Sequence, residues 1–139
     1  MNSDTNTFKT VEEAREYFIN DRFAHFNGIT IDSLDGGSCT CSMDIREDHR
    51  NAMGGVMGGV VFTLADFALA VSANNLHFPT VALEVNINFL SNSRGKRLIA
   101  NTSCVKNGKT TVVFRIDITD DTGRDIALVI GTGYKMEEK

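Results

Sequence analysis

Apolar positions repeat with two different periods along the chain, and the first period is helical. From Val11 onward, apolar residues recur three or four positions apart, which predicts a helix that ends at Gly28. Thr10 and Glu13 stand where the two residues of a capping box would satisfy free backbone donors at a helix start. The pattern therefore predicts one N-terminal helix.

A period of two follows and is typical of β-strands. Residues 29–45 alternate apolar and polar side chains around the glycine pair 36–37, which predicts a hairpin. Four more strands are predicted from the same alternation, over residues 81–90, 97–106, 110–119 and 124–136. Short turns join these four strands, so we expect antiparallel pairing.

The segment between the two sets of strands is different. Residues 46–59 hold four of the twelve glycines and no apolar period, so we expect a loop there. Residues 60–73 suit a helix in which only Thr63, Asp66 and Ser72 are polar. We expect this helix to be buried nearly all round, and its apolar run, interrupted by Asp66, is too short to span a bilayer.

The order of these elements predicts an α+β fold. A helix of this kind is best buried by an antiparallel sheet that curls around it. The 139 residues suffice for one domain with its own core. We therefore expect a single domain over 1–139, with a flexible N-terminus at 1–8.

Charge and composition exclude some function classes. The chain has 14 Lys and Arg against 18 Asp and Glu, a formal net charge of −4, with no long block of one sign. Nucleic-acid binding is therefore disfavoured, because it needs a concentrated basic face. The polar first residues lack the pattern of a secretion signal, so we expect a cytoplasmic protein without a membrane partner.

The cysteines and histidines predict no metal site. Cys39, Cys41 and Cys104 are interpreted as buried or half-buried thiols in a reducing compartment. The three histidines do not stand at metal-ligand spacing from each other or from the cysteines. A glycine loop of the phosphate-binding or dinucleotide-binding type is also missing from the sequence.

Asp66 is the residue that fits worst with simple packing. Its neighbours at helical spacing are mostly apolar, and a carboxylate in such surroundings is costly unless it lies in a cleft or is hydrogen-bonded. Gly58 and Gly59 begin the same helix, where free N–H groups and the helix dipole favour negative charge. That helix end can polarise a carbonyl as an oxyanion hole, and Asn51 adds a neutral polar group nearby.

The spacing of these residues favours a dimer. Gly58 and Asp66 are eight residues apart, which is about 12 Å along a helix. If two copies of the helix lie antiparallel, Gly58 of one subunit faces Asp66 of the other. A water-bridged arrangement within one chain is the alternative.

The resemblance to a known family lies between Asn51 and Ala70, which read N-A-M-G-G-V-M-G-G-V-V-F-T-L-A-D-F-A-L-A. This segment resembles the signature of hotdog-fold acyl-CoA thioesterases of the PaaI-like (phenylacetyl-CoA thioesterase-like) group. Their pattern has Asn-x-x-Gly, then His-Gly-Gly, then Leu-Ala-Asp or Leu-Val-Asp. Residues 81–90 and 108–110 are also similar, so the resemblance extends from about residue 28 to the C-terminus.

The resemblance implies both a fold and an activity. The hotdog fold is a curved antiparallel sheet wrapped around one long apolar helix, here at about residues 58–74, with an extra N-terminal helix in this chain. The implied reaction is hydrolysis of an acyl-CoA thioester to the free acid and CoA. It needs no cofactor, because CoA is part of the substrate, and it takes place in homodimers that often pair again into tetramers.

Residue roles follow from the same resemblance. Asp66 corresponds to the carboxylate that activates water or attacks directly, Gly58 to the glycine whose N–H polarises the carbonyl, and Asn51 to a polar residue from the partner subunit. The expected substrate-binding positions are Met57, Gly59, Phe62, Thr63, Ala82 and Leu83. The expected contacts to the charged end of CoA are Arg94, Lys96, Arg97 and Lys109, whose positive charges suit phosphates.

Two positions depart from the family pattern. Met57 stands where the family usually has His, and Ala82 stands where some members have Ser or Thr. Neither side chain can donate a hydrogen bond. The alternative function is therefore a non-catalytic acyl-CoA-binding or lipid-binding hotdog protein. A hotdog dehydratase would need an Asp/His pair, for which His49 is the nearest candidate, and His49 is also the candidate to replace the missing imidazole.

Overall fold

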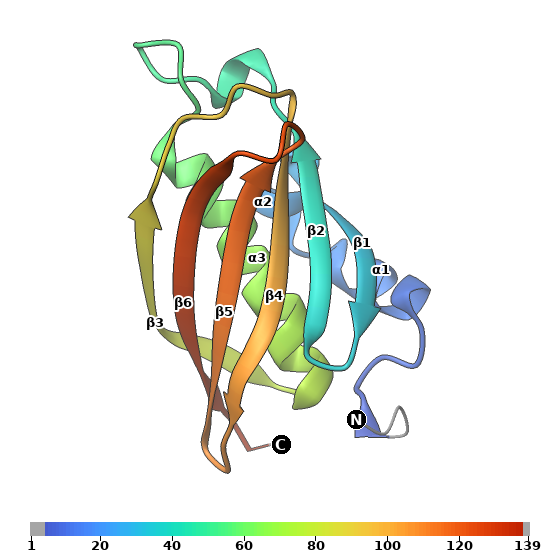
Figure 1. Ribbon diagram of the computed structural model, residues 1–139. Coiled ribbons are helices and arrows are strands. Elements are labelled where there is room, and N and C mark those ends of the chain that lie inside the picture. Colours follow the sequence, from blue (N-terminus) through green and yellow to red (C-terminus); the bar gives the residue numbers. More distant parts are fainter. Residues whose placement is uncertain (1–4, 138–139) are drawn as a thin grey trace.

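The computed structural model describes residues 5–137, which form one curved antiparallel sheet around a long helix (Figure 1). The strand order is β1-β2-β4-β5-β6-β3. The strands are β1 (Thr30–Asp35), β2 (Ser38–Asp44), β3 (Thr80–Phe89), β4 (Arg97–Asn107), β5 (Thr111–Asp120) and β6 (Asp125–Lys135). The helices are α1 (Val11–Phe18), α2 (Arg22–Phe26), the short 3-10 helix η2 (Glu47–His49) and α3 (Gly58–Leu76). This arrangement confirms the predicted hotdog fold.

The core lies between α3 and the concave face of the sheet. Inward-facing residues of the central strands, among them Leu98, Phe114, Ile116 and Val129, are fully buried against it. At Gly131 on β6, a Cβ atom would come within 2.8 Å of the Leu69 side chain. The close contact between α3 and this strand therefore requires a glycine at position 131. The alternating pattern of the sequence therefore corresponds to the two faces of the sheet.

One face of α3 is not covered by the sheet, which corrects the expectation that the helix is buried nearly all round. Phe62, Thr63, Asp66 and Ala70 are only half-buried and follow one another at helical spacing, with Gly59 exposed at the end. The sheet wraps around the remaining faces only. We call this set of five residues the open stripe.

α3 begins at Gly58, where the expected helix at about residues 58–74 begins, and ends two residues later than expected. α3 has 19 residues, because the helix continues past the apolar run as far as Leu76. By length and composition alone it is long enough to cross a membrane. Most of it is buried inside the sheet instead, as in the core helix of a folded domain.

The N-terminal region forms two helices rather than the predicted single one. α1 ends at Phe18, and the Asn20 side chain donates to the Tyr17 carbonyl where the chain leaves the helix. α2 then begins at Arg22 and buries only Ala24. Phe23 is exposed, so it does not continue the apolar face of α1 that the spacing indicated.

Side chains fix both ends of this region. The Thr10 hydroxyl accepts the Glu13 N–H at 3.1 Å, as predicted, but the Glu13 carboxylate accepts from Lys9 instead of closing the capping box. In the expected flexible segment 1–8, residues 1–4 lie outside the described part. Thr7 and Phe8 are held in place, because their N–H groups bond to the main chain and side chain of Asn75.

The cysteines are free thiols, as predicted. The Cys39 and Cys41 side chains share the inner face of β2, with their sulfur atoms 3.8 Å apart. Next to them, the Ser72 and Thr102 hydroxyls are hydrogen-bonded at 2.6 Å, which satisfies a buried polar pair in the core.

A buried carboxylate holds the two loops at one end of the sheet together. Asp120 is 1% exposed, and one of its oxygens accepts from the Ser93 hydroxyl and the N–H groups of Arg94 and Gly95. The other accepts three bonds from Thr122 and Arg124. Burial alone would raise the pKa of Asp120, but these hydrogen bonds hold it well below the usual range for aspartate.

We predict that Asp120→Asn destabilises the fold by about 3 kcal/mol, because an amide cannot accept all these hydrogen bonds. The depressed pKa gives wild-type Asp120 a stabilising contribution above pH 3.8, its ordinary pKa, and this contribution is lost as the pH falls through the folded-state value. Urea unfolding at several pH values measures both effects. Asp125→Asn, an exposed substitution close by, is the control, and equal stability of the two variants would contradict the prediction.

Candidate functional site

The loop before α3 is shaped by its own backbone. The Met57 N–H donates to the His49 carbonyl at 2.9 Å, and Arg50 and Val56 form an isolated antiparallel bridge. Met57 caps α3 but provides no side-chain acceptor. The first N–H groups of the helix therefore point out of its end toward the surface.

Asn51 closes the tight turn at the tip of this loop. Its side-chain oxygen accepts the N–H groups of Met53 and Gly55, at 3.0 and 3.1 Å. Its main chain bonds to Gly54 and Gly55 as well. Because the oxygen is engaged in the turn, the Asn51 side chain has its NH₂ group to offer to a ligand or a partner chain.

The two glycines at the start of α3 have different surroundings. A Cβ atom on Gly58 would lie 3.0 Å from the Phe89 ring, so packing within the chain accounts for this glycine. A Cβ atom on Gly59 would meet no atom of the described residues within 4 Å. Glycine is unfavourable in a helix, so the open space at Gly59 points to an approach by a group from outside the chain.

Asp66 lies in the middle of the open stripe, between two hollows. We call the first the acid cavity, about 230 Å³ in volume, which Asp66 shares with Asp21 and Phe23. On the other side Asp66 faces β3, in a hollow that Val81 and Ala82 line. Burial raises the pKa of the Asp66 carboxyl, and the negative charge of Asp21 raises it further.

Sequence reasoning missed Asp21. This residue stands at the N-cap position of α2 but makes no capping hydrogen bond there, and burial raises its pKa. It is 45 residues from Asp66 in the sequence, and only the packing of α2 against α3 brings both into one cavity. An aspartate at an N-cap position next to a short helix would have been the only signal.

The predicted substrate-binding residues fall into two groups, one at and near the start of α3 and one on β3. Phe62 and Thr63 lie on the open stripe, and the Thr63 hydroxyl donates to the Gly59 carbonyl at 2.7 Å. Ala82 faces the hollow beside Asp66, whereas Leu83 is exposed at a bulge in β3. Gly59, at the end of the open stripe, lines one cavity together with Met57 and Thr63.

Two further cavities flank the start of α3. The loop cavity, about 400 Å³, is lined by Gly58 and Phe89 and by the polar segment 91–93 after β3. The α2 cavity, about 380 Å³, is lined by Gly59 and Met57 and extends under α2. The helix start therefore lies between a partly polar hollow and a mostly apolar one.

His49 is not placed to replace the missing imidazole. It is buried, its Nδ1 accepts the Arg46 N–H at 2.9 Å, and its Nε2 lies 3.2 Å from the Asn27 side-chain oxygen. Burial lowers its pKa, and the Arg46 charge lowers it further. A neutral ring with both nitrogens bonded within the chain cannot serve as the general acid or base of a dehydratase.

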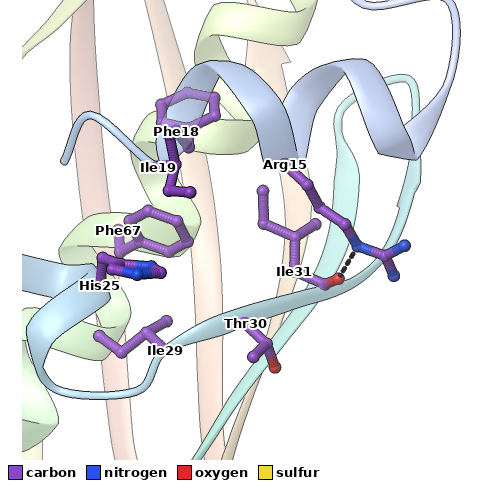
Figure 2. A pocket seen from close by; sticks show the side chains of 8 residues that line it. All are labelled: Arg15, Phe18, Ile19, His25, Ile29, Thr30, Ile31 and Phe67. Atoms are coloured by element: carbon purple, nitrogen blue, oxygen red, sulfur yellow. Dashed lines mark hydrogen bonds between the residues drawn. The ribbon is translucent and has the colours of Figure 1, made fainter. Parts of the chain in front are cut away.

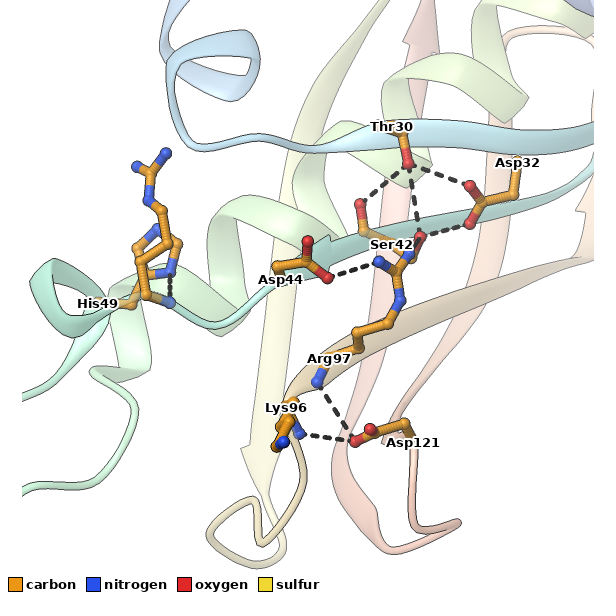
Figure 3. Close-up of polar contacts among 9 residues, drawn as sticks. Thr30, Asp32, Ser42, Asp44, His49, Lys96, Arg97 and Asp121 are labelled. Atoms are coloured by element: carbon orange, nitrogen blue, oxygen red, sulfur yellow. Dashed lines mark hydrogen bonds and ion pairs between the residues drawn. The ribbon is translucent and has the colours of Figure 1, made fainter.

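The predicted CoA contacts do not form one cluster. Arg94 and Lys96 lie on the β3–β4 connection, at the same end of the sheet as the loop before α3 (Figure 1). Lys109 lies on the β4–β5 turn at the opposite end (Figure 1). Arg97 is bound within the chain, because its guanidinium contacts Asp44 at 2.5 Å and the Ser42 hydroxyl (Figure 3).

A further cavity lies under the N-terminal helices. Phe18, Ile29 and Phe67 line it, and Arg15 at its edge donates to the Ile31 carbonyl at 2.8 Å (Figure 2). Asp66 does not line this cavity.

Among residues 5–137, no group of three or more His, Cys, Asp or Glu side chains is placed to hold a metal ion.

This arrangement has the parts of an acyl-transfer site. The N–H groups at the start of α3 can stabilise negative charge on a carbonyl oxygen. A carboxylate with a raised pKa can accept a proton near neutral pH. On one chain, however, these parts are eight residues of helix apart.

The chain is similar to known proteins. Residues 53–127 match the model of the thioesterase superfamily. The acyl-coenzyme A thioesterase PaaI of Escherichia coli is 30% identical over 92% of this chain and 92% of its own length. Acyl-coenzyme A thioesterase 13 of Homo sapiens is 32% identical over 71% of this chain and 74% of its own length.

Solved structures show the same likeness. The PaaI protein from the phenylacetic acid degradation operon of E. coli superposes with a TM-score of 0.86, at 29% identity, over 91% of this chain and 92% of that one. A hypothetical thioesterase protein of Streptococcus pneumoniae, solved with coenzyme A, superposes with a TM-score of 0.81, at 26% identity, over 89% and 98%.

We predict that Asp21→Asn lowers the pKa of Asp66, because it removes the nearby negative charge and leaves the effect of burial. A carbon NMR titration of the Asp66 carboxyl measures the change. Asp35→Asn, an exposed substitution at the far end of β1, is the control. A pKa of Asp66 that is the same in both variants would show that the two carboxylates do not interact.

Proposed function

The chain belongs to the thioesterase superfamily, and we propose that it hydrolyses acyl-CoA thioesters at a site formed between two copies of the chain. The observation that carries the proposal is the open stripe of α3. It exposes Asp66 on a helix that the sheet otherwise covers, and the same helix starts with two glycines. The two relatives named as acyl-coenzyme A thioesterases support this reaction class.

The length of α3 supports a shared site. Gly58 and Asp66 are separated by about 12 Å of helix rise, whereas a carbonyl oxygen must lie about 3 Å from its donors. One chain therefore cannot easily bring its own carboxylate to a carbonyl at its own helix start. Two α3 helices that lie antiparallel about a two-fold axis bring Asp66 of each subunit to the glycines of the other.

The surface beside the open stripe suits such a pairing. β3 is an edge strand of the sheet, and within residues 5–137 no strand pairs with its outer side. Val81 and Leu83 on this strand are 48% and 63% exposed. An edge with free N–H and C=O groups and apolar side chains favours pairing with a second β3. That pairing would cover the open stripe as well.

The proposed reaction is addition of water to the thioester carbonyl. The carbonyl oxygen accepts the N–H groups of Gly58 and Gly59, and the helix dipole stabilises the negative charge that develops on it. The Asp66 carboxylate of the other subunit takes a proton from water, whose oxygen then bonds to the carbonyl carbon. The carbon–sulfur bond breaks, and the proton passes to the CoA sulfur.

Other residues support binding. The Asn51 NH₂ group, left free by the turn, lies on the loop that leads to the glycines and is available to the substrate. The charged end of CoA is assigned to Arg94 and Lys96, which lie at the same end of the sheet. Arg97 is excluded from this role by its contacts with Asp44 and Ser42.

We predict that Asp66→Asn lowers kcat for acyl-CoA hydrolysis at least about 100-fold, because the amide cannot accept the proton of water. Release of free thiol from a panel of acyl-CoAs measures the rate. Equal rates for wild type and variant would rule out Asp66 as the base. Wild-type protein that binds acyl-CoA but releases no thiol would instead support the non-catalytic binding function.

The same variant should not lose stability at neutral pH. The raised pKa means that ionised Asp66 costs folding free energy above its folded-state pKa, and that this cost is absent below the ordinary value of 3.8. Asp66→Asn removes the charge, so its melting temperature at pH 7 is expected to equal or exceed that of wild type. A lower melting temperature would mean that the lost activity reflects unfolding.

Mixing two inactive variants tests whether the site is shared. Gly59→Ala is expected to be inactive, because its methyl group enters the space where the substrate approaches, without a clash inside the chain. In a mixed dimer with Asp66→Asn, one site has both wild-type residues. Random exchange makes half of the dimers mixed, so about a quarter of the wild-type activity should return. A site within one chain would give no recovery.

A further inference from the structure

The α2 cavity begins at the residues that are proposed to hold the thioester carbonyl. Met57, Gly59 and Thr63 line its inner end, and Gly59 leaves the space open because it lacks a Cβ atom. The acyl group is bonded directly to the carbonyl carbon. It must therefore lie in a space that starts next to these residues.

The two sides of the helix start differ in chemistry. The loop cavity is lined by Ser91, Asn92 and Ser93 and lies next to the connection that carries Arg94 and Lys96. This side suits the amide-rich and phosphate-bearing arm of CoA. The opposite side, the α2 cavity, is left for the acyl group.

The walls of the α2 cavity are mostly apolar. Phe23 on α2, Ile29 before β1 and Met43 on β2 face it, together with Val60 on α3. Met43 and Ile29 are buried, so the two walls that they form belong to the packed core. A cavity of about 380 Å³ has room for roughly 12 non-hydrogen atoms, if each takes the volume of a liquid water molecule.

The polar side chains around this cavity are already bonded to the protein. His49 bonds through both ring nitrogens, and the Asn27 side chain accepts from His49 and donates to the Phe23 carbonyl at 2.9 Å. The Thr63 hydroxyl donates to the Gly59 carbonyl, and Asp48 forms an ion pair with Arg46. A ligand hydroxyl group that lies against the apolar walls at Ile29, Met43 and Val60 would lose its water without gaining a hydrogen-bond partner.

We propose that the α2 cavity is the acyl-binding pocket, with Phe23 as its outer wall, and that it selects apolar acyl groups over hydroxylated ones. This inference rests on the proposed function, because that function places the carbonyl at Gly59. It names the substrate class that the same site would accept: acyl-CoAs with alkyl or unsubstituted aryl groups of limited length.

α2 offers a matched pair of variants. Phe23 is 69% exposed and lines the cavity, whereas Phe26 on the same short helix is 71% exposed and stacks with the Arg46 guanidinium instead. Alanine at either position removes the same apolar area from the same helix. Only Phe23→Ala removes a wall of the pocket.

The test measures binding of non-hydrolysable thioethers of CoA by calorimetry. S-hexyl-CoA should bind wild type at least about tenfold more tightly than S-ethyl-CoA, because the longer chain reaches the apolar walls. The ω-hydroxyhexyl analogue should lose this advantage. Phe23→Ala should reduce the preference for S-hexyl-CoA about tenfold, while Phe26→Ala keeps the wild-type preference. Phe23→Leu replaces Phe23→Ala if that variant does not fold.

Three results would overturn the proposal. They are equal binding of the hexyl and ethyl analogues, equal binding of the hexyl and hydroxyhexyl analogues, or the same preference in the Phe23 and Phe26 variants. Thiol release from hexanoyl-CoA is measured in parallel. Turnover without a chain preference overturns only the acyl pocket, whereas a hexyl preference without turnover supports the pocket and overturns the proposed hydrolysis.

Discussion

The apolar helix α3 is the constraint on which the rest of the structure depends. It has polar residues at only a few positions, so it must be surrounded by other apolar groups on most of its circumference. A curved antiparallel sheet provides that surface, and a glycine at 131 lets it come close enough. The sheet does not close around the helix, so one stripe with Asp66 stays open. The fold and the candidate site therefore follow from the same packing problem.

Local signals were enough to predict much of this fold. The alternation along the strands, the apolar run of α3 and the turns at glycines each depend on neighbouring residues, and the strands lie within a few residues of the predicted bounds. The segment 51–70 identified the thioesterase family, and the comparisons confirm it. Asp66 could be selected as a candidate site residue because a carboxylate in an apolar helix needs an explanation.

Long-range packing was beyond the sequence pattern. The position of Asp21 beside Asp66 depends on how α2 packs against α3. The break between α1 and α2 was missed for a different, local reason, because the apolar spacing carries no signal for the Asn20 side chain that bonds to the Tyr17 carbonyl. The basic residues at 94–97 and 109 looked alike in sequence but lie at opposite ends of the sheet. The open stripe could not be read from composition, because it reflects where the sheet ends and not how apolar the helix is.

The free edge of β3 has a consequence for the folding of this protein in a cell. The backbone N–H and C=O groups on the outer side of this ten-residue strand have no partner strand within residues 5–137, and they form a template that any extended chain can join, including chains that are still unfolded. If β3 pairs with a second copy of the chain as proposed, that pairing competes with aggregation, and the outcome depends on how fast one newly folded chain meets another. Expression level, dilution and crowding by unfolded chains would then influence the yield of native protein as strongly as the intrinsic stability of the single subunit.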